Sequence, residues 1–92
     1  MGFVLSRKAK KKTMREKILE RLTPIFQEVF NPNVVVIETL DASQVEEWDS
    51  LNHIALIIAI EEEFGLEFST DEIAQMQKVG DLVDILVRRN AV

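Results

Sequence analysis

The sequence predicts an all-α fold with three main helices and one short helix, and three observations support this. Apolar residues recur at helical spacing in three stretches. Two of the predicted helices begin with a capping box, a hydroxyl residue followed three positions later by Glu. The one run with strand propensity, Val34-Val35-Val36-Ile37, has no second run with which to pair. A sheet is therefore disfavoured.

The first helix is predicted to begin after Thr13, which forms a capping box with Glu16. Pro24 lies inside this helix and removes one backbone hydrogen bond, so we expect a kink or a break there. The helix should end before Asn31-Pro32-Asn33. Its apolar stripe contains Ile18, Leu22, Ile25 and Val29, flanked by Leu19, Phe26 and Phe30.

A long loop is predicted over residues 31–48, between the first and second helices. We expect its β-branched run to form an extended segment that apolar side chains anchor to the domain. Loops of this length are uncommon in so small a domain and often carry function.

The second helix is predicted to begin at Asp49 or Ser50, either of which can act as the N-cap, and to end at Gly65. Residues 54–60 are all apolar, far fewer than the roughly 20 residues of a membrane span. We therefore expect this helix to be buried nearly all round, because it is central or lines a cavity.

The two remaining helices follow closely. Ser69 and Glu72 form a second capping box, which predicts a short helix over about 70–76. The last helix starts near Val79 and ends at Arg88-Arg89, whose positive charges suit the C-terminal end of the helix dipole.

Length and composition restrict the possible functions. A chain of 92 residues forms one domain, here predicted over 13–92, so a catalytic cleft between two domains is excluded. The absence of Cys excludes disulfides and thiol chemistry, and makes the cytoplasm the default location. The single His excludes a multi-histidine metal site, and no metal site is predicted.

Charge is distributed unevenly along the chain. Seven of the eleven basic residues but only one of the sixteen acidic residues lie in 1–17, so the rest of the chain is strongly acidic. An acidic body disfavours nucleic acids and favours partners with basic surfaces. Residues 1–12 are predicted to form a flexible basic tail, and the short myristoylation-like pattern Met1-Gly2 to Ser6 is weak evidence for a lipid anchor. No stable membrane insertion is expected.

The residues at the start of the second helix carry the functional signal. Ser50 directly follows Asp49, after a long loop, and could simply be an N-cap. Alternatively, the free N–H groups and positive dipole at this helix end would suit a phosphate ester on its hydroxyl. A hydrolytic Ser50–His53 pair is disfavoured because the sequence has no G-x-S-x-G elbow.

From Thr13 to the C-terminus the chain resembles the acyl carrier protein family. The most specific part is Asp49-Ser50-Leu51 with the apolar helix after it, the run Glu61-Glu62-Glu63-Phe64 and the Gly turn. The resemblance implies a four-helix bundle that is not itself an enzyme. It also implies that a separate phosphopantetheinyl transferase esterifies Ser50 with 4′-phosphopantetheine from coenzyme A, and that the arm's thiol carries acyl or aminoacyl groups as thioesters.

The resemblance also implies roles for other residues of this helix. Asp49 and Leu51 would flank the prosthetic group, and the carrier would be a monomer that docks on enzymes with basic patches. The expected partner-binding residues are Asn52, His53, Ile58, Glu61 and Glu62. The expected lining of a pocket for the acyl chain is Leu56, Ile57, Ala59 and Ile60.

Two departures from the family pattern bear on the pathway. Carriers of the fatty-acid type usually have acids two and five residues after the modified serine, whereas this chain has Asn52 and Ala55. We therefore expect a specialised carrier rather than one that serves housekeeping fatty acid synthesis. The main alternative is a non-catalytic helical docking module with a membrane-seeking basic tail, and modification of Ser50 would separate the two.

Overall fold

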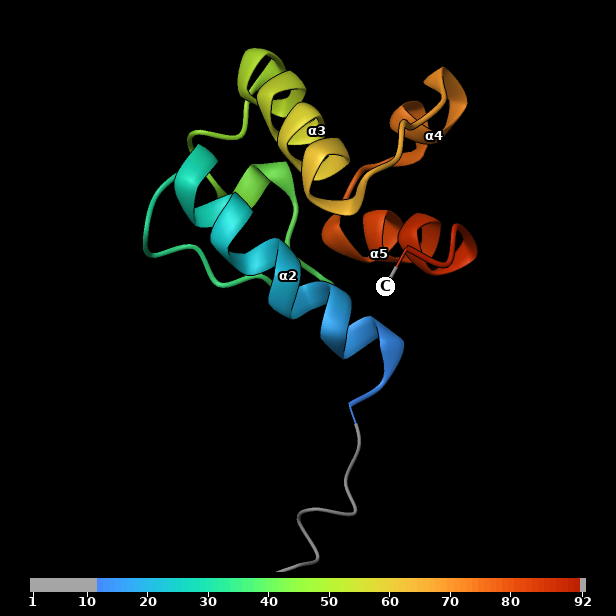
Figure 1. Cartoon of the computed structure of the whole chain (residues 1–92). Coiled ribbons are helices and arrows are strands. Elements are labelled where there is room, and N and C mark those ends of the chain that lie inside the picture. Colours follow the sequence, from blue (N-terminus) through green and yellow to red (C-terminus); the bar gives the residue numbers. More distant parts are fainter. Residues whose placement is uncertain (1–11, 92) are drawn as a thin grey trace, which may run out of the picture.

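The computed structural model describes residues 12–91, which form four α-helices and one short 3-10 helix (Figure 1). The helices are α2 (Met14–Val29), α3 (Ser50–Phe64), α4 (Thr70–Gln75) and α5 (Val79–Arg88), with η1 (Ala42–Gln44) in the loop before α3. The predicted all-α fold, with three longer helices and a short one, is confirmed. Residues 1–11, nearly all of the predicted tail, lie outside the described part of the chain.

Helix α2 begins with the predicted capping box. The Thr13 hydroxyl oxygen accepts a hydrogen bond from the Glu16 backbone N–H (3.1 Å), and the Glu16 carboxylate accepts one from the Thr13 N–H (2.8 Å). Pro24 does not split the helix, which continues as a single element to Val29. The helix therefore accommodates the proline without a break.

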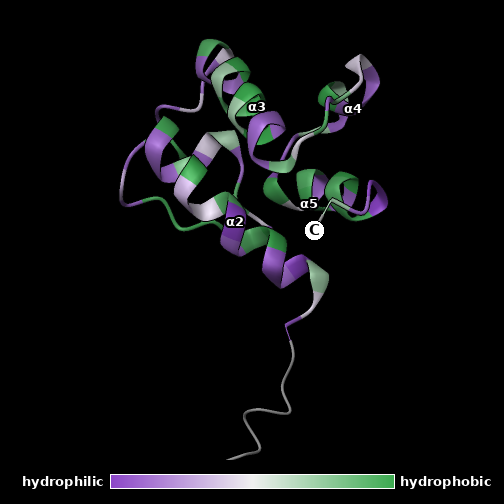
Figure 2. Cartoon of the chain, in the orientation of Figure 1, coloured by the Kyte–Doolittle hydropathy of each residue, from purple (hydrophilic) through white to green (hydrophobic). Residues whose placement is uncertain are grey.

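A single hydrophobic core joins α2, α3, α5 and the long loop. Helix α2 contacts both α3 and α5, and Figure 2 shows that hydrophobic residues make up most of α5. The fully buried side chains of the three helices are Ile18, Leu22, Phe26, Leu56, Ile60, Val79, Val83, Ile85 and Leu86.

The expectation that α3 is buried nearly all round is wrong. Leu51, Ile54 and Ile58 are 76%, 58% and 51% exposed. These residues follow one another at three- and four-residue spacing, so they share one face of the helix. We call this face the α3 stripe. Helix α3 therefore buries one apolar face and presents another to solvent.

The loop over 31–48 is ordered by contacts that are distant in sequence. Its side chains Val34, Val36, Leu40 and Val45 are buried in the core. Its carbonyls also cap α5: the N–H of Val79 donates to Leu40 O (2.9 Å), and that of Gly80 donates to Glu38 O (2.8 Å). Backbone N–H groups at a helix start lack partners within the helix, so this loop supplies two of the missing acceptors.

Helix α4 is short and is attached to the end of α5. It begins with the predicted capping box, in which the Ser69 hydroxyl accepts from the Glu72 N–H (3.1 Å). The Arg89 guanidinium donates to the Glu72 carboxylate (2.8 Å) and to the backbone carbonyl of Glu67 (2.9 Å). The hydrogen bond from the Ser69 backbone and the Arg89 charge lower the pKa of Glu72.

Candidate functional site at the start of helix α3

Asp49, not Ser50, is the N-cap of α3. Its backbone is extended, and its carboxylate oxygen Oδ1 accepts a hydrogen bond from the Asn52 N–H at 2.8 Å. Ser50 is therefore the first helical residue. The sequence allowed either residue to cap the helix, and the structure assigns the role to the carboxylate.

The Ser50 side chain is exposed, and its hydroxyl makes no hydrogen bond to any residue within 12–91. The backbone N–H groups of Ser50 and Leu51 likewise have no acceptor in this part of the chain, since the first i to i−4 bond of the helix runs from His53 to Asp49 (2.8 Å). An exposed hydroxyl beside free N–H donors suits a phosphate ester, because those donors and the helix dipole favour an anion. The residues present therefore fit a phosphodiester-linked group on Ser50.

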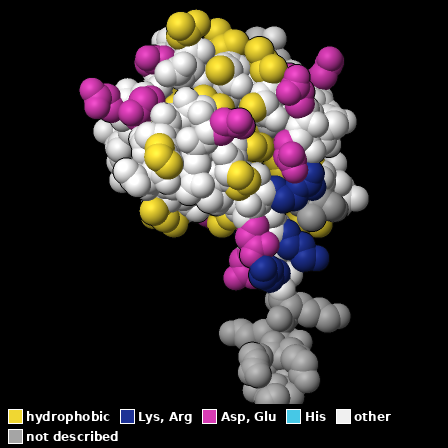
Figure 3. Space-filling view, turned by 60° about the vertical axis from the view of Figure 1, so that its left-hand side comes forward, with side chains coloured by type: hydrophobic (Ala, Val, Ile, Leu, Met, Phe, Trp, Pro, Cys, Tyr) yellow, Lys and Arg dark blue, Asp and Glu magenta, His cyan; other side chains and the backbone are white. Residues whose placement is uncertain are grey.

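Exposed apolar residues continue from Ser50 along the α3 stripe. Leu51 adjoins the candidate serine, and Ile54 and Ile58 follow on the same helix face. The space-filling view in Figure 3 shows exposed hydrophobic side chains interspersed with acidic ones over its upper part, whereas Lys and Arg side chains lie lower down. The structure therefore combines apolar and negatively charged groups on one side of the molecule.

Asn52 and Ala55 occupy different environments. Asn52 is half-buried, and its side-chain amide donates to the Glu47 carbonyl at 2.8 Å, which ties the first turn of α3 to the preceding loop. Ala55 is exposed. Of the two positions, only Ala55 could accept an acidic residue without losing an internal hydrogen bond.

His53, one of the predicted partner-binding residues, is half-buried. Its Nδ1 accepts a hydrogen bond from the Trp48 indole N–H at 3.0 Å, and burial lowers the pKa of its imidazole. The Trp48 ring packs against the rings of Phe26 and Phe30. The hydrogen bond to His53 has no clear signal in the sequence, because it depends on how the loop enters α3.

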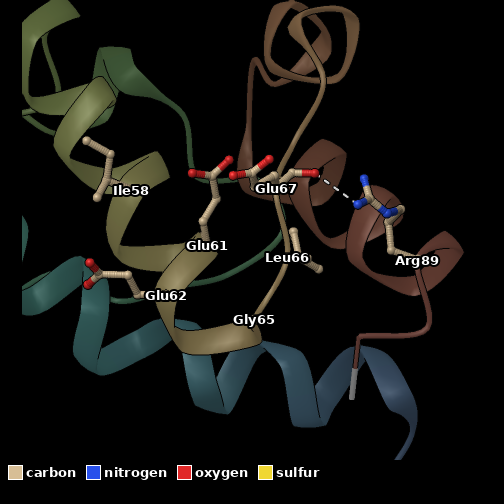
Figure 4. Close-up of a pocket in the computed structure, with 7 residues that line it drawn as sticks. All are labelled: Ile58, Glu61, Glu62, Gly65, Leu66, Glu67 and Arg89. Atoms are coloured by element: carbon tan, nitrogen blue, oxygen red, sulfur yellow. Dashed lines mark hydrogen bonds between the residues drawn. The ribbon is translucent and has the colours of Figure 1, made fainter.

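Three predicted partner-binding residues, Ile58, Glu61 and Glu62, line one cavity at the C-terminal end of α3. It measures about 720 Å³, and Figure 4 shows Arg89 on its opposite side. Glu61 also has an internal role, since its carboxylate accepts from the Phe68 N–H at 2.8 Å, whereas Glu62 is exposed. Sequence reasoning missed the role of Glu61 because the Phe68 N–H lies beyond the Gly65 turn.

The residues predicted to line an acyl pocket lie on the inward side of α3. Leu56, Ile57 and Ile60 are buried in the hydrophobic core, and Ala59 is half-buried against it. They are separated from Ser50 by at least one helical turn along α3.

None of the helices in residues 12–91 combines the length and apolar character needed to cross a membrane. In the same part of the chain, no three His, Cys, Asp or Glu residues are grouped so that they could hold a metal ion.

Comparisons with known proteins agree with the features of this site. Residues 20–86 match the family model described as the phosphopantetheine attachment site. The acyl carrier protein of Solidesulfovibrio magneticus is 36% identical over 76 residues, covering 83% of this chain and 88% of that protein. That of Coprothermobacter proteolyticus is 34% identical over 74 residues, covering 78% and 89%.

A solved structure supports the same assignment. The solution structure of the holo acyl carrier protein of Geobacter metallireducens superposes with a TM-score of 0.74 at 35% identity, covering 79% of this chain and 85% of that one. Such carriers are not enzymes, and their prosthetic group is covalent 4′-phosphopantetheine. The chain, with its matching helices and phosphopantetheine attachment domain, belongs to the acyl carrier protein family.

Proposed function

We propose that Ser50 is the residue to which phosphopantetheine is attached. The observation that carries this assignment is the hydroxyl on the first residue of α3, which is exposed and makes no hydrogen bond within 12–91. Two backbone N–H groups beside it also have no acceptor within 12–91. Asp49 caps the helix, so the Ser50 hydroxyl is not needed for folding. Leu51 flanks the serine on its other side and is exposed.

Attachment requires a separate transferase and coenzyme A. The Ser50 hydroxyl oxygen would attack the phosphorus that bears pantetheine, forming an ester bond as the pyrophosphate link breaks. Adenosine 3′,5′-bisphosphate would leave, and a base of the transferase would take the hydroxyl proton. Once bound, the arm supplies a terminal thiol that holds acyl or aminoacyl groups as thioesters. The chain has no thiol of its own.

We place the partner-binding surface on the exposed side of α3. The α3 stripe offers apolar contact next to Ser50, and Glu62 adds an exposed negative charge further along the helix. Such a surface suits enzymes with basic docking patches. Binding should be weakened by salt, because exposed charges are screened within about 10 Å at 0.1 M ionic strength. Asn52, His53 and Glu61 contribute less directly, since each also has an internal hydrogen bond.

An apolar cargo could be sheltered by the inward side of α3. The four residues proposed to line this pocket, Leu56, Ile57, Ala59 and Ile60, are already packed in or against the core. Sheltering a chain there would require α3 to move relative to its neighbours, since protein cores have few voids larger than a water molecule.

We further propose that the carrier acts as a cytoplasmic monomer in a specialised pathway rather than in housekeeping fatty acid synthesis. The proposal of a specialised pathway rests on Asn52 and Ala55, which occupy positions where fatty-acid-type carriers usually have acids. It rests also on the hydrogen bond from the Asn52 side-chain amide to the Glu47 carbonyl. The α3 face near Ser50 is therefore less acidic than in those carriers.

Ala55→Glu tests the proposed role of this face. The new carboxylate would lie on an exposed position near Ser50, so it should improve recognition by enzymes of fatty acid synthesis through their basic patches. The measurement is the KM of such an enzyme for each loaded carrier, at low and high salt. Ala55→Gln is the control, with similar size and no charge. Equal KM values for the three proteins would rule out this face as the determinant of partner choice.

The carrier function is tested by intact mass. The protein is incubated with coenzyme A, Mg²⁺ and a phosphopantetheinyl transferase, and a gain equal to the mass of the phosphopantetheine group is expected. No gain with several active transferases would remove the carrier proposal and favour the non-catalytic docking module, whose basic tail lies mainly outside the described residues.

A further inference from the structure

The run Val34-Val35-Val36-Ile37 has strand propensity, but no segment within residues 12–91 pairs with it as a strand. Burial alternates along the run. Val34 and Val36 are buried in the core, whereas Val35 and Ile37 are 69% and 50% exposed. A period of two is typical of an extended strand. One set of side chains therefore anchors the run to the domain, and the other set points outward.

The two edges of this run differ in their hydrogen bonds. The Val34 N–H donates to the Asn31 carbonyl at 3.3 Å, and the Val34 carbonyl accepts from the Gln27 side-chain amide at 3.2 Å. Gln27 belongs to α2, so this edge faces that helix. Alternate residues of an extended segment share an edge, so the N–H groups of Val35 and Ile37 lie on the opposite edge. These two N–H groups and the Val35 carbonyl have no hydrogen-bond partner within residues 12–91.

We call this opposite edge, with the outward side chains of Val35 and Ile37, the free edge. It belongs to the loop that leaves the end of α2 and forms the left-hand margin of the molecule in Figure 1. A row of unpaired N–H and C=O groups on an exposed strand edge is a template for a strand from another chain.

The free edge borders a groove with an acidic rim. Val35 and Ile37 line this groove, which measures about 420 Å³, and residues 44–47 line it as well. Glu46 is exposed and forms no ion pair within residues 12–91. The neighbouring Glu47 carboxylate accepts a hydrogen bond from the Asn31 side-chain amide at 2.9 Å. The groove thus combines apolar surface, backbone hydrogen-bonding groups and negative charge.

These features define the chemistry of the occupant. Backbone donors and acceptors on a strand edge pair with another extended backbone, whose alternate side chains can enter the groove. The acidic rim favours a segment that contains Lys or Arg. A second copy of this chain fits less well, because residues 18–92 carry fifteen acidic but only four basic side chains, so two acidic bodies would be brought together.

We propose that the free edge is a docking site for an extended, basic segment of a partner protein, which adds to residues 34–37 as a strand. The site is separate from the α3 stripe and does not depend on the proposed attachment to Ser50. Glu47 lies only three residues before Ser50, a span of at most about 11 Å. A partner bound at the free edge would therefore be held close to the start of α3.

The first experiment uses a six-residue peptide that alternates Val and Lys, with both ends blocked. The ¹⁵N-labelled full-length protein, without the prosthetic group, is titrated with the peptide, and amide resonances and amide exchange rates are recorded. Binding should shift the resonances of residues 34–37 and slow the exchange of the Val35 and Ile37 N–H groups. The Val36 N–H, on the edge that faces α2, should exchange as before.

A peptide that alternates Val and Glu is the control for charge and should not bind. Absence of shifts at residues 34–37 with the Val–Lys peptide would overturn the proposal. Slower exchange at Val36 without slower exchange at Val35 and Ile37 would also overturn it, because the peptide would then not be paired with the free edge.

Val35→Pro tests the backbone contribution. It removes one N–H donor from the free edge, and the fold should tolerate it because this N–H has no partner within residues 12–91. Val35→Ala is the matched control, since it shortens the side chain but keeps the donor. The Kd for the Val–Lys peptide should be about 3- to 10-fold higher for Val35→Pro than for Val35→Ala. Equal Kd values for two folded variants would contradict strand addition.

Glu46→Gln tests the charge contribution and leaves the backbone unchanged, so it is decisive even where circular dichroism shows that Val35→Pro is unfolded. It should raise the Kd for the Val–Lys peptide about 1.5- to 5-fold, as for the loss of an exposed ion pair, and weaken its salt dependence. Asp71→Asn, an exposed change on α4 outside the groove, should leave the Kd unchanged. The same Kd and salt dependence in both variants would overturn the assignment of a basic occupant.

Two further measurements distinguish other occupants of the free edge. Deletion of residues 1–11 should leave the Kd for the Val–Lys peptide unchanged, and a Kd more than tenfold lower would mean that this basic segment itself occupies the edge. Sedimentation of the full-length protein should show no self-association that depends on Val35. A dimer that Val35→Pro abolishes would assign the edge to a second copy, and either result would overturn the proposal of a partner protein.

Discussion

Asp49 and Ser50 are neighbours in sequence but have separate roles at the start of α3. The Asp49 carboxylate accepts from the Asn52 N–H, which stabilises the helix end. The Ser50 hydroxyl has no partner within the described residues and is exposed. Because the cap is supplied by the preceding residue, Ser50 is available for modification without a cost in stability.

This division predicts unequal effects of two alanine substitutions on stability. Asp49→Ala should lower the free energy of unfolding by about 0.5–2 kcal/mol, the usual cost of losing an N-cap side chain. Ser50→Ala should change it by much less, because its hydroxyl makes no hydrogen bond in residues 12–91. Urea unfolding of both variants, followed by far-UV circular dichroism, measures the difference. A greater loss in Ser50→Ala than in Asp49→Ala would mean that the serine is the cap.

At the scale of elements, the helix ends that depend on residues close in sequence were predicted correctly. The capping boxes at Thr13 and Ser69 and the Gly65 turn, where φ is +67°, need contacts only a few positions apart, and all are present. Helix α3 was mispredicted as buried all round, because an apolar run does not show whether one face is left for a partner. The expected anchoring of the 31–48 loop by its apolar side chains is confirmed, since Val34 and Val36 are buried. The pairing of its carbonyls with the start of α5 could not be predicted, because the partners are distant in sequence.

The junction between this loop and α5 predicts that Gly80→Ala destabilises the fold. A Cβ at Gly80 would lie 3.1 Å from the Glu38 carbonyl oxygen, which already accepts the Gly80 N–H. Crowding of this kind costs about 1–3 kcal/mol, and the better helix propensity of Ala offsets up to about 1 kcal/mol. Urea unfolding should therefore show a net loss of stability. Unchanged or increased stability would mean that the Glu38 carbonyl can move away without weakening the cap of α5.

At the scale of the whole molecule, a basic N-terminal segment precedes the folded carrier domain. The core is formed by residues from Ile18 to Leu86, and the matched family region covers 20–86. Deletion of residues 1–11 should therefore leave the helical circular dichroism signal and Tm essentially unchanged, because this segment has no helical apolar stripe of its own.

Thermal unfolding of the full chain and of the shortened chain, at equal protein concentration and salt, checks this boundary. The shortened chain keeps Lys12 and Thr13, so the capping box of α2 is retained. A fall of several degrees in Tm would show that Phe3, Val4 or Leu5 contributes to the core, and that the domain begins earlier than 13.

The most direct test of the central claim is to locate the prosthetic group by mass spectrometry of peptides from the loaded protein. The unmodified sequence, Ser50→Ala and the control Ser43→Ala are each incubated with coenzyme A, Mg²⁺ and an active transferase. We expect the group on Ser50 alone, full loading of Ser43→Ala and none of Ser50→Ala, whose circular dichroism should remain that of a folded protein. Attachment to Ser6, Ser43 or Ser69, or loading of folded Ser50→Ala, would contradict the account.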